Sequence, residues 1–300
     1  MEKHIFKKNF NTIYNNSSLL RICWFYLRFL KKNKYIPNFK TPKTYNEKVN
    51  YRKNNPKNDL FSVCADKIKA KEYVAEIISP EVVIPNYYIG DSISFEKMKE
   101  LLEINGDCLL KANHNSGPVY LLKSESSVQE IQLAVKDVNK QLEIDYGKLK
   151  NETWYSHIKP RILVEKRLMP GIGESDLKDY KFHVFKQSDG AIKIVLGVYF
   201  DRGINTTASF FDEELNYLPF SYNFASIKTS INKPLNYEQM LSYVKKLSEP
   251  FSYVRVDFYN INGNIYFGEL TFADGSGCAQ FSSYQHDLWM GNLWQIDPSF

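Results

Sequence analysis

The sequence predicts an α+β fold, because it contains both antiparallel strand pairs and clear helical patterns. Residues 253–272 hold two apolar, β-rich runs around Asn262-Gly263, a dipeptide suited to a type I′ hairpin turn. A second alternating strand and an antiparallel neighbour occupy residues 179–199. Residues 127–144 repeat apolar side chains at i, i+4, i+7 and i+11, which indicates a long helix.

Composition limits the class of protein. Of 300 residues, 43% are hydrophobic and 15% aromatic, enough for a buried core, so global disorder is excluded. The four cysteines form no C-x-x-C pair, which argues against a zinc site or disulfide framework and fits a reducing cytosol. We expect no signal peptide and no transmembrane helix, since no run of 18 apolar residues occurs. The predicted location is the cytoplasm.

Positive charge is concentrated at the start of the chain. Residues 1–60 hold 14 Lys and Arg against three Asp and Glu, which leaves 25 against 31 in the rest. Residues 18–30 form an apolar helix pattern among lysines, which either packs on the body or lies in a membrane interface. The second interpretation predicts peripheral contact of residues 1–36 with the inner face of the membrane. No nucleic-acid-binding motif is present, so nucleic acid is not an expected partner.

Further elements follow in order along the chain. Residues 41–52 read as a turn and a capped helix, and a helix opening at residue 65 carries Asp66 near its N-terminus, where the dipole favours an acid. Residues 82–84 suggest a short strand. A strand at 108–112 then leads into small polar residues and a glycine, a loop that can present N–H groups to phosphate oxygens.

The hairpin at 253–272 carries one acid on each strand, Asp257 and Glu269. A two-residue turn places Asp257 opposite Gly268, and a loop one residue longer places it opposite Glu269, so the register stays open. Buried carboxylates need a neutralising cation, and magnesium suits such oxygen ligands. The alternative is a hairpin whose two acids lie at a solvent-exposed edge and bind no metal. For a metal site, we expect that neutralising either acid relieves repulsion and leaves the fold intact.

The hairpin resembles a known family. Arg255-Val-Asp257, followed by Gly-Glu-Leu-Thr-Phe at 268–272 and a glycine-rich turn, is similar to the metal hairpin of ATP-grasp enzymes. Residues 42–48, Pro-Lys-Thr-Tyr-Asn-Glu-Lys, resemble a signature of the TupA-like ATP-grasp family of polysaccharide gene clusters. Thr271 departs from the pattern, because many relatives have asparagine there.

The resemblance implies ATP and magnesium as cofactors and assigns roles to matching positions. Asp257 and Glu269 would hold magnesium, and Arg255 and Lys181 would be catalytic. The nucleotide-binding residues implied are Lys67, Lys111, Ser116 and Gly117 at the phosphates, Glu165, Arg167 and Leu168 at adenine, and Asp179 at the ribose. The similarity runs from about residue 37 to residue 291.

The resemblance also implies a domain organisation and an activity. We expect a basic helical segment at 1–36, an N-terminal region at 37–84, a small subdomain at 85–167 and a large one at 168–300, with nucleotide between the last two. The implied activity joins an amine or amino acid to a sugar carboxylate of a bacterial polysaccharide precursor through an acyl phosphate. A glycosyltransferase and an ATP-grasp sugar kinase are the alternatives, although no Asp-x-Asp motif supports the first.

Overall fold

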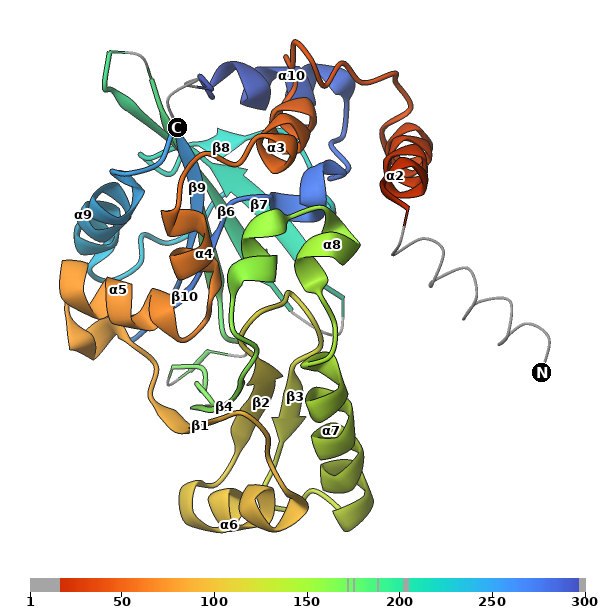
Figure 1. The fold of residues 1–300 in the computed structure, drawn as a ribbon. Helices are drawn as coiled ribbons and strands as arrows, with labels where there is room; N and C mark the ends of the chain where they lie inside the picture. Colours follow the sequence, from red (N-terminus) through yellow and green to blue (C-terminus); the bar gives the residue numbers. More distant parts are fainter. Residues whose placement is uncertain (1–16, 172, 175, 188, 202–204, 297–300) are drawn as a thin grey trace.

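The computed structural model describes residues 17–171, 173–174, 176–187, 189–201 and 205–296. Helices and two antiparallel sheets make up this part of the chain, so the α+β prediction is confirmed. In Figure 1 the larger sheet lies above the smaller one, with short helices between them. The first 16 residues of the predicted basic segment lie outside the described residues.

The larger sheet has six strands, and each neighbouring pair is antiparallel. In spatial order they are β10 (Asn264–Thr271), β9 (Tyr253–Ile261), β5 (Asp179–Lys186), β6 (Ile192–Phe200), β7 (Thr207–Phe211) and β8 (Tyr217–Leu218). The predicted antiparallel pairing within residues 179–199 is confirmed, because β5 pairs with β6 from Asp179–Tyr199 to Lys186–Ile192.

The hairpin between β9 and β10 turns at the predicted dipeptide. Asn262 has φ of 52° and Gly263 has φ of 88°. A type I′ turn requires positive φ at both central residues, which asparagine and glycine adopt more readily than other residues. The Asn260 side chain accepts a hydrogen bond from the Gly263 N–H at 3.0 Å and fixes the turn.

The smaller sheet has its own hydrophobic core. Its strands, in spatial order, are β1 (Asn86–Gly90), β4 (Ile162–Lys166), β2 (Cys108–Ala112) and β3 (Tyr120–Leu122). Two helices, α6 (Phe95–Asn105) and α7 (Val128–Gln141), pack apolar side chains against it. Ser127 and Glu130 form a capping box at the start of α7, which confirms the predicted helix there.

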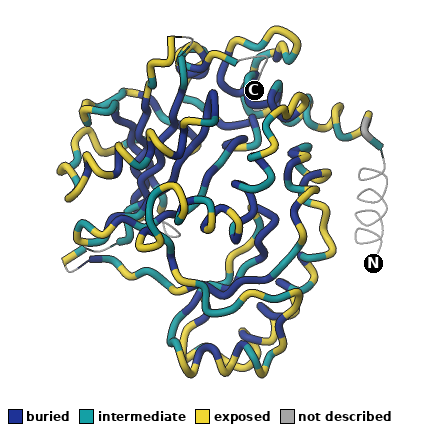
Figure 2. Tube along the Cα trace, turned by 60° about the vertical axis from the view of Figure 1, so that its left-hand side comes forward, coloured by how far each residue is buried: buried dark blue, intermediate teal, exposed yellow. Residues whose placement is uncertain are grey.

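The two faces of the larger sheet differ. Side chains alternate between faces along a strand, and Phe182, Val256 and Phe258 lie on the face that packs against α9 (Tyr237–Ser248). The other face carries Tyr253 under α3 (Tyr45–Asn54) at one end. Buried segments run through this centre in Figure 2, whereas much of the outer surface is exposed.

The remaining helices surround the larger sheet and the junction of the two sheets. They are α2 (Ser18–Asn33), α4 (Leu60–Ala65), α5 (Lys69–Ile77), α8 (Tyr146–Lys150), α10 (Tyr284–Asn292) and the 3₁₀ turns η1 (Pro80–Val82), η2 (Thr153–His157) and η3 (Asp274–Gly277). Within the described ranges, no helix has the length and apolar character needed to cross a membrane.

Two local predictions differ from the structure. The helix expected from residue 65 begins at Lys69, because the Asp66 side chain accepts from the Ile68 N–H at 2.9 Å and holds a turn there. Residues 82–84 form no strand. Val82 ends the turn η1, and Val83 makes one isolated parallel bridge to Phe267.

Candidate active site

Charged side chains gather on one face of the larger sheet, where β5, β9 and β10 lie side by side. Lys181 pairs in register with Asp257, and Asp257 pairs with Glu269. Residues two apart on a strand share a face, so Asp179 and Arg255 lie on the same side. The sheet therefore brings together five of the residues singled out in the sequence.

A β-bulge sets the position of Glu269. From the turn to Phe267, the strands keep the register of a two-residue hairpin, and the register then shifts by one residue at Gly268. Without this shift Glu269 would pair with Val256 and point to the opposite, apolar face. The bulge moves Glu269 opposite Asp257 instead, which is a recognised use of bulges next to active sites.

Arg255 connects the carboxylates of this cluster. Its Nε and Nη2 donate to Asp257 Oδ1 and Oδ2 at 2.7 and 2.8 Å, a bidentate pair. Nη2 also donates to Glu269, and Nη1 donates to Asp274. Burial alone would lower the pKa of Arg255, but the three carboxylates outweigh burial and raise it well above its usual value.

Lys181 supplies the second cation of the cluster. Its Nζ lies 2.8 Å from Asp179 Oδ2 and also donates to Asp257. Burial opposes a charged lysine, but the attraction of Asp257 prevails and raises the pKa of Lys181. His183 lies two residues beyond Lys181 on β5, and burial lowers its pKa to about 3, so its ring is neutral. Its Nδ1 lies 3.0 Å from the Tyr253 hydroxyl.

The donor set fits a divalent cation. Asp257, Glu269 and Asp274 are three carboxylates around Arg255, and Lys181 adds one further positive charge, so negative charge is in excess. Among the described residues, no group of three or more His, Cys, Asp or Glu side chains is arranged to hold a metal. Magnesium does not require such a cage, because it takes one or two carboxylates and completes its shell with water and substrate phosphates.

A second charged cluster lies on the smaller sheet. Glu165 on β4 forms ion pairs with Lys111 on β2, at 2.7 Å, and with Lys71 on α5. Only 4% of the Glu165 side chain is exposed. Burial would raise the pKa of Glu165, and the two ammonium groups outweigh it and lower the pKa. Sequence reasoning singled out Lys111 and Glu165 but not their mutual ion pair.

Lys67 adds a third ammonium group beside this cluster. Its Nζ donates to the Asn115 carbonyl of the loop after β2, and its N–H donates to the Asn113 carbonyl at 3.2 Å. Burial, together with Lys111, lowers the pKa of Lys67 to about 8. The negative charge of Glu269 acts to raise the pKa of Lys67, so the two clusters lie within electrostatic reach of each other.

The loop after β2 presents Ser116 and Gly117 beside these lysines. Ser116 is exposed and Gly117 is half-buried. The Gly117 N–H donates to Asn115 Oδ1 at 3.1 Å, and the Asn115 amide donates to Gln141 on α7 at 3.0 Å. Asn115 thus fixes the loop to α7, while Ser116 remains at the surface.

Arg167 and Leu168 lie apart from the Lys111–Glu165 pair. They follow β4, and Arg167 donates to Asp107 Oδ2 at 2.6 Å at the start of β2. Leu168 is half-buried. The structure therefore joins Arg167 to an acid of the smaller sheet and does not bring it into the lysine cluster.

Sequence reasoning missed several charged residues of the site. Lys71 follows Lys67 by four residues, a helical spacing that could have linked the two. Asp274 lies inside the glycine-rich turn after the hairpin, and sequence reasoning gave its carboxylate no role. Lys53 and Glu152 gave no sequence signal, because 223 residues separate Lys53 from its partner Ser276.

The turn η3 is bound to both of these missed residues. Lys53 Nζ donates to Ser276 Oγ at 2.9 Å and to the Ser276 carbonyl at 3.1 Å, and Ser276 Oγ donates to Glu152 Oε1 at 2.6 Å. Ser276 has φ of 53°, a conformation that costs a non-glycine residue energy. These buried contacts hold the turn next to Asp274, on the side of the cluster that faces α3.

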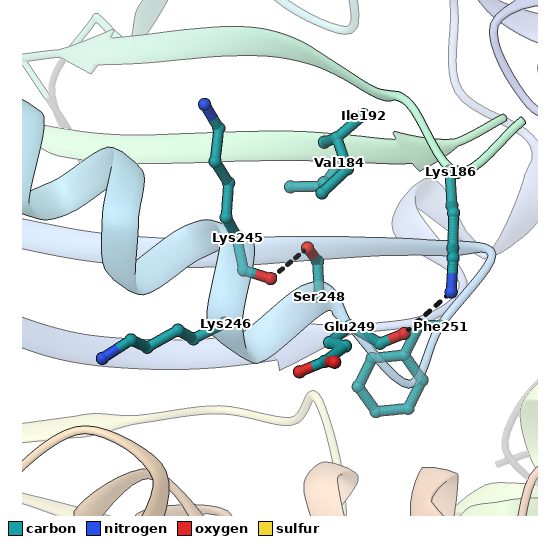
Figure 3. A pocket seen from close by; sticks show the side chains of 9 residues that line it. Val184, Lys186, Ile192, Lys245, Lys246, Ser248, Glu249 and Phe251 are labelled. Carbon is teal, nitrogen blue, oxygen red and sulfur yellow. Dashed lines mark hydrogen bonds between the residues drawn. The ribbon is translucent and has the colours of Figure 1, made fainter.

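A separate hollow of about 400 Å³ lies at the far end of β5 and α9 (Figure 3). Its lysines point in different directions in this view, and two of them have partners of their own: Lys245 pairs with Glu213, and Lys186 donates to the Glu249 carbonyl at 3.3 Å. The hollow contains none of the residues that the sequence singled out.

Several solved structures resemble this chain. D-Alanine–D-alanine ligase from Helicobacter pylori is 18% identical, with a TM-score of 0.47 over 78% of this chain and 62% of that chain. N5-carboxyaminoimidazole ribonucleotide synthetase from Thermus thermophilus is 15% identical, with a TM-score of 0.42 over 70% and 45%. D-Alanine–D-alanine ligase from Bacillus anthracis, solved with ATP, is 14% identical, with a TM-score of 0.39 over 70% and 54%.

This chain therefore spans less than two thirds of the length of these solved enzymes. A search of curated proteins found no match. The model of the TupA-like ATP-grasp family matches residues 47–295, most of the chain, and in ATP-grasp ligases magnesium dependence is typical. The family resemblance carried by the hairpin and by residues 42–48 is thereby confirmed, and with it the ATP-grasp fold. The chain belongs to the TupA-like ATP-grasp family.

Proposed function

We propose that this chain is an ATP-dependent carboxylate–amine ligase that acts on a precursor of a bacterial surface polysaccharide. The observation that carries the proposal is the pair of clusters of opposite charge balance, which lie within electrostatic reach of each other. One holds Asp257, Glu269 and Asp274 around Arg255. The other holds Lys111 and its two neighbouring lysines around a single acid. A magnesium–nucleotide complex needs both, because it carries a cation and several anionic phosphates.

The nucleotide would lie between the subdomains at residues 85–167 and 168–300. Lys67 and Lys111 would bind the phosphates as point charges, and the loop with Ser116 and Gly117 would add backbone N–H groups. Glu165, Arg167 and Leu168 would contact adenine, with Asp179 at the ribose. Lys71 joins the phosphate-binding group in our proposal, since it shares Glu165 with Lys111.

Magnesium would be held by Asp257 and Glu269, where it would neutralise charge on the nucleotide phosphates. Glu269 is the more accessible of the two, since 46% of its side chain is exposed against 3% for Asp257. Arg255 donates to both acids, and one of its guanidinium N–H groups would turn toward the transferring phosphate. Lys181 would keep Asp257 in place from the other side.

The reaction would proceed in two steps. A carboxylate oxygen of the sugar acid attacks the γ-phosphorus of ATP, the bond to the β-phosphate oxygen breaks, and ADP leaves. The amine nitrogen then attacks the acyl carbon, phosphate leaves with the former carboxylate oxygen, and the nitrogen loses a proton to give an amide. Arg255 and Lys181 stabilise the charge that develops on the transferred phosphoryl group.

The polysaccharide context and the amine rest on the family resemblance, and a product assay tests them against the alternatives. A ligase releases ADP and phosphate in equal amounts when both a uronic acid and an amine are present. A sugar kinase releases ADP without phosphate and needs no amine. A glycosyltransferase releases a nucleoside diphosphate from a sugar nucleotide and ignores ATP. Either of these last two patterns would overturn the ligase proposal.

We also propose that α2 rests on an anionic membrane surface. Leu19, Ile22, Trp24 and Leu27 on α2 expose half or more of their area, whereas Phe29 on the same helix is buried. Residues 17–46 contain seven Lys and Arg and no Asp or Glu. An exposed apolar helix face within a basic segment is suited to anionic lipid, and each basic residue contributes about 1 kcal/mol there.

Vesicle co-sedimentation tests the membrane contact. The full chain should sediment with phosphatidylserine-containing vesicles at low salt, remain in solution with phosphatidylcholine alone, and detach as salt is added. Trp24→Ser combined with Leu27→Ser should weaken the binding several-fold. Val128→Ser, a change of an exposed apolar residue on α7, is the matched control. A full chain that stays in solution with anionic vesicles would contradict the contact.

A further inference from the structure

Of the three acids around Arg255, Asp274 has no role in the proposed reaction. It lies in the turn η3, just after β10, and 12% of its side chain is exposed. Its Oδ1 accepts from Arg255 Nη1 and from the Gly275 N–H, the latter at 2.9 Å, and its Oδ2 accepts from the Tyr222 hydroxyl at 2.7 Å. Both carboxylate oxygens therefore have partners, and two of the donors come from distant parts of the chain.

Tyr222 is held in the position from which its hydroxyl reaches Asp274. Only 1% of the residue is exposed, and its ring packs edge-on against Phe281 and His183, with ring centres 4.8 and 5.8 Å apart. Burial raises the pKa of Tyr222 well above its usual value, so the hydroxyl keeps its proton and donates it to the hydrogen bond. Because close packing fixes the ring, the hydroxyl donates to Asp274 from one direction.

The turn that carries Asp274 is also anchored by α3. Asn50 donates to the Gly277 carbonyl at 2.7 Å, and Lys53 donates to Ser276 Oγ at 2.9 Å. A Cβ atom at Gly277 would lie 2.3 Å from the Asn50 amide nitrogen, so the two segments are in close contact. Asp274 is thus fixed both by its own hydrogen bonds and by the support of its turn, as is required of a group that positions another side chain.

The three acids bind different nitrogens of Arg255. Asp257 accepts from Nε and Nη2, and Glu269 accepts from Nη2, whereas Asp274 accepts from Nη1. Asp257 and Glu269 are the two acids that we assign to magnesium, so both would turn from the guanidinium toward the metal. Nη2 would then be free for phosphate while Nη1 keeps its partner. A buried guanidinium needs such a remaining acid, because a buried charge without a partner is strongly destabilising.

We propose that Asp274, fixed by the Tyr222 hydroxyl, is the positioning residue that holds Arg255 against the phosphoryl group during its transfer. The inference rests on the proposed function, in which Arg255 stabilises the charge that develops on that group. Asp274 touches neither the phosphate nor the metal and acts through the arginine. Its effect therefore falls on the transition state, where this charge develops, and much less on bound ATP.

A different role for Asp274 would be that of a third protein ligand to magnesium. The two roles predict different losses on substitution. A ligand to the metal strengthens the binding of magnesium–ATP itself. A positioning residue for Arg255 leaves that binding nearly unchanged and strengthens the binding of a mimic of the transition state.

The test compares two probes by calorimetry on the full chain. Magnesium–ATP reports the ground state, and magnesium–ADP with aluminium fluoride mimics the phosphoryl group in transfer. In the natural chain, aluminium fluoride should strengthen the binding of magnesium–ADP tenfold or more. Asp274→Asn keeps the shape of the side chain and removes its charge. It should reduce this gain to less than twofold, while the affinity for magnesium–ATP changes less than threefold.

Tyr222→Phe is a milder second variant, because Asp274 keeps its charge and loses only one donor. It should reduce the aluminium fluoride gain three- to fivefold. Tyr237→Phe is the matched control, since Tyr237 is 2% exposed and its hydroxyl donates to the Glu213 carbonyl at 3.0 Å, away from the cluster. Both variants should lower the thermal unfolding temperature by similar amounts, and only Tyr222→Phe should lower the gain. A merely structural role for Tyr222 would not produce this difference.

A gain of natural size in Asp274→Asn, or the same gain in Tyr222→Phe and Tyr237→Phe, would overturn the proposal. A loss of magnesium–ATP affinity in Asp274→Asn as large as the loss of the gain would assign Asp274 to the metal and overturn it too. If Asp274→Asn does not fold, Tyr222→Phe and its control decide the question. A natural chain that does not bind magnesium–ATP contradicts the proposed function and this inference with it. ATP binding without an aluminium fluoride gain contradicts this inference alone.

Discussion

The charged clusters on the two sheets are built from the same kinds of residue and have opposite charge balance. On the larger sheet, Asp257, Glu269 and Asp274 outnumber Arg255 and Lys181. At the smaller sheet, Lys111 and Lys71 form ion pairs with Glu165, and Lys67 lies close enough to Lys111 that its pKa is lowered by burial and by that second ammonium group. In both clusters, buried charged side chains form ion pairs with internal partners, which is the condition for burying them.

The difference shows how the chain can fold without ligands and still bind them. Arg255 and Lys181 stabilise the acids where a metal would otherwise be needed, and Glu165 does the same for the lysines in place of phosphate. Each cluster retains an excess of charge, negative on one sheet and positive on the other. A bound magnesium–nucleotide complex would satisfy both excesses at once.

The largest expected effect comes from removing the shared acid of the larger sheet. Asp257→Asn should lower the free energy of unfolding by about 3–5 kcal/mol, because Arg255 and Lys181 lose their common acceptor in a buried place. The sequence alone predicts an intact fold on the ground of relieved repulsion. The ion pairs reverse that expectation. Unfolding in urea measures the free energy of unfolding of the variant and of the natural chain. A variant as stable as the natural chain would show that these pairs contribute little.

Removing a lysine of the smaller sheet should have a smaller effect, confined to nucleotide binding. Lys111→Ala should weaken ATP binding about 10- to 100-fold, since a charge-assisted phosphate contact is lost while Lys71 still neutralises Glu165. Calorimetric titration of ATP with magnesium gives the affinity. Lys123→Ala, an exposed lysine just after β3, is the matched control. Identical ATP affinities in Lys111→Ala and the control would contradict the phosphate role.

The smallest expected effect is a pH dependence at Lys67. Its pKa of about 8 means that the ammonium group is mostly charged at pH 7 and mostly neutral at pH 9. ATP affinity should therefore fall, by less than about tenfold, as the pH rises across this range. The decline should be absent in Lys67→Met, and an equal decline in that variant would assign the pH effect to another group.

The same pKa has a consequence for stability in the absence of ATP. Between pH 8 and pH 10.5 the unfolded chain keeps the Lys67 proton that the folded chain has lost. The unfolded state then binds more protons, so the contribution of Lys67 raises the free energy of unfolding with pH in this window. Comparison of the natural chain with Lys67→Met isolates this contribution.

The local features of the fold could be predicted because they depend on neighbouring residues. Asn262-Gly263 specifies its turn through the positive φ of both residues, and Ser127 with Glu130 specifies a helix start. The short helix α4 gave no comparable signal, since six residues are too few for a periodic pattern.

The arrangement of the candidate site could be predicted only in part. The sequence identified Asp257 and Glu269 but left their register open, because a bulge at Gly268 depends on how the finished sheet packs. It identified Lys111 without its acid Glu165 as partner, since β2 and β4 become neighbours only through the tertiary fold. Asp274 was missed because nothing in its local sequence distinguishes it from a solvated charge. Lys71 was missed because its four-residue spacing from Lys67 does not reveal the acid, Glu165, that it meets in the fold.

The most direct test of the account asks whether magnesium acts through the larger-sheet cluster. Calorimetry measures the affinity for ATP with and without magnesium in the natural chain, in Glu269→Gln and in Glu238→Gln. Glu238 is an exposed acid on α9, packed on the other face of the sheet, and serves as the control. Since Glu269 is 46% exposed, its change should leave the stability nearly unaltered.

Magnesium should strengthen ATP binding tenfold or more in the natural chain and in Glu238→Gln, a gain of at least about 1.4 kcal/mol. In Glu269→Gln the gain should fall to less than twofold, while the affinity for ATP without magnesium stays the same or increases. A magnesium gain of equal size in Glu269→Gln and in the natural chain would contradict the assignment of the metal to this cluster.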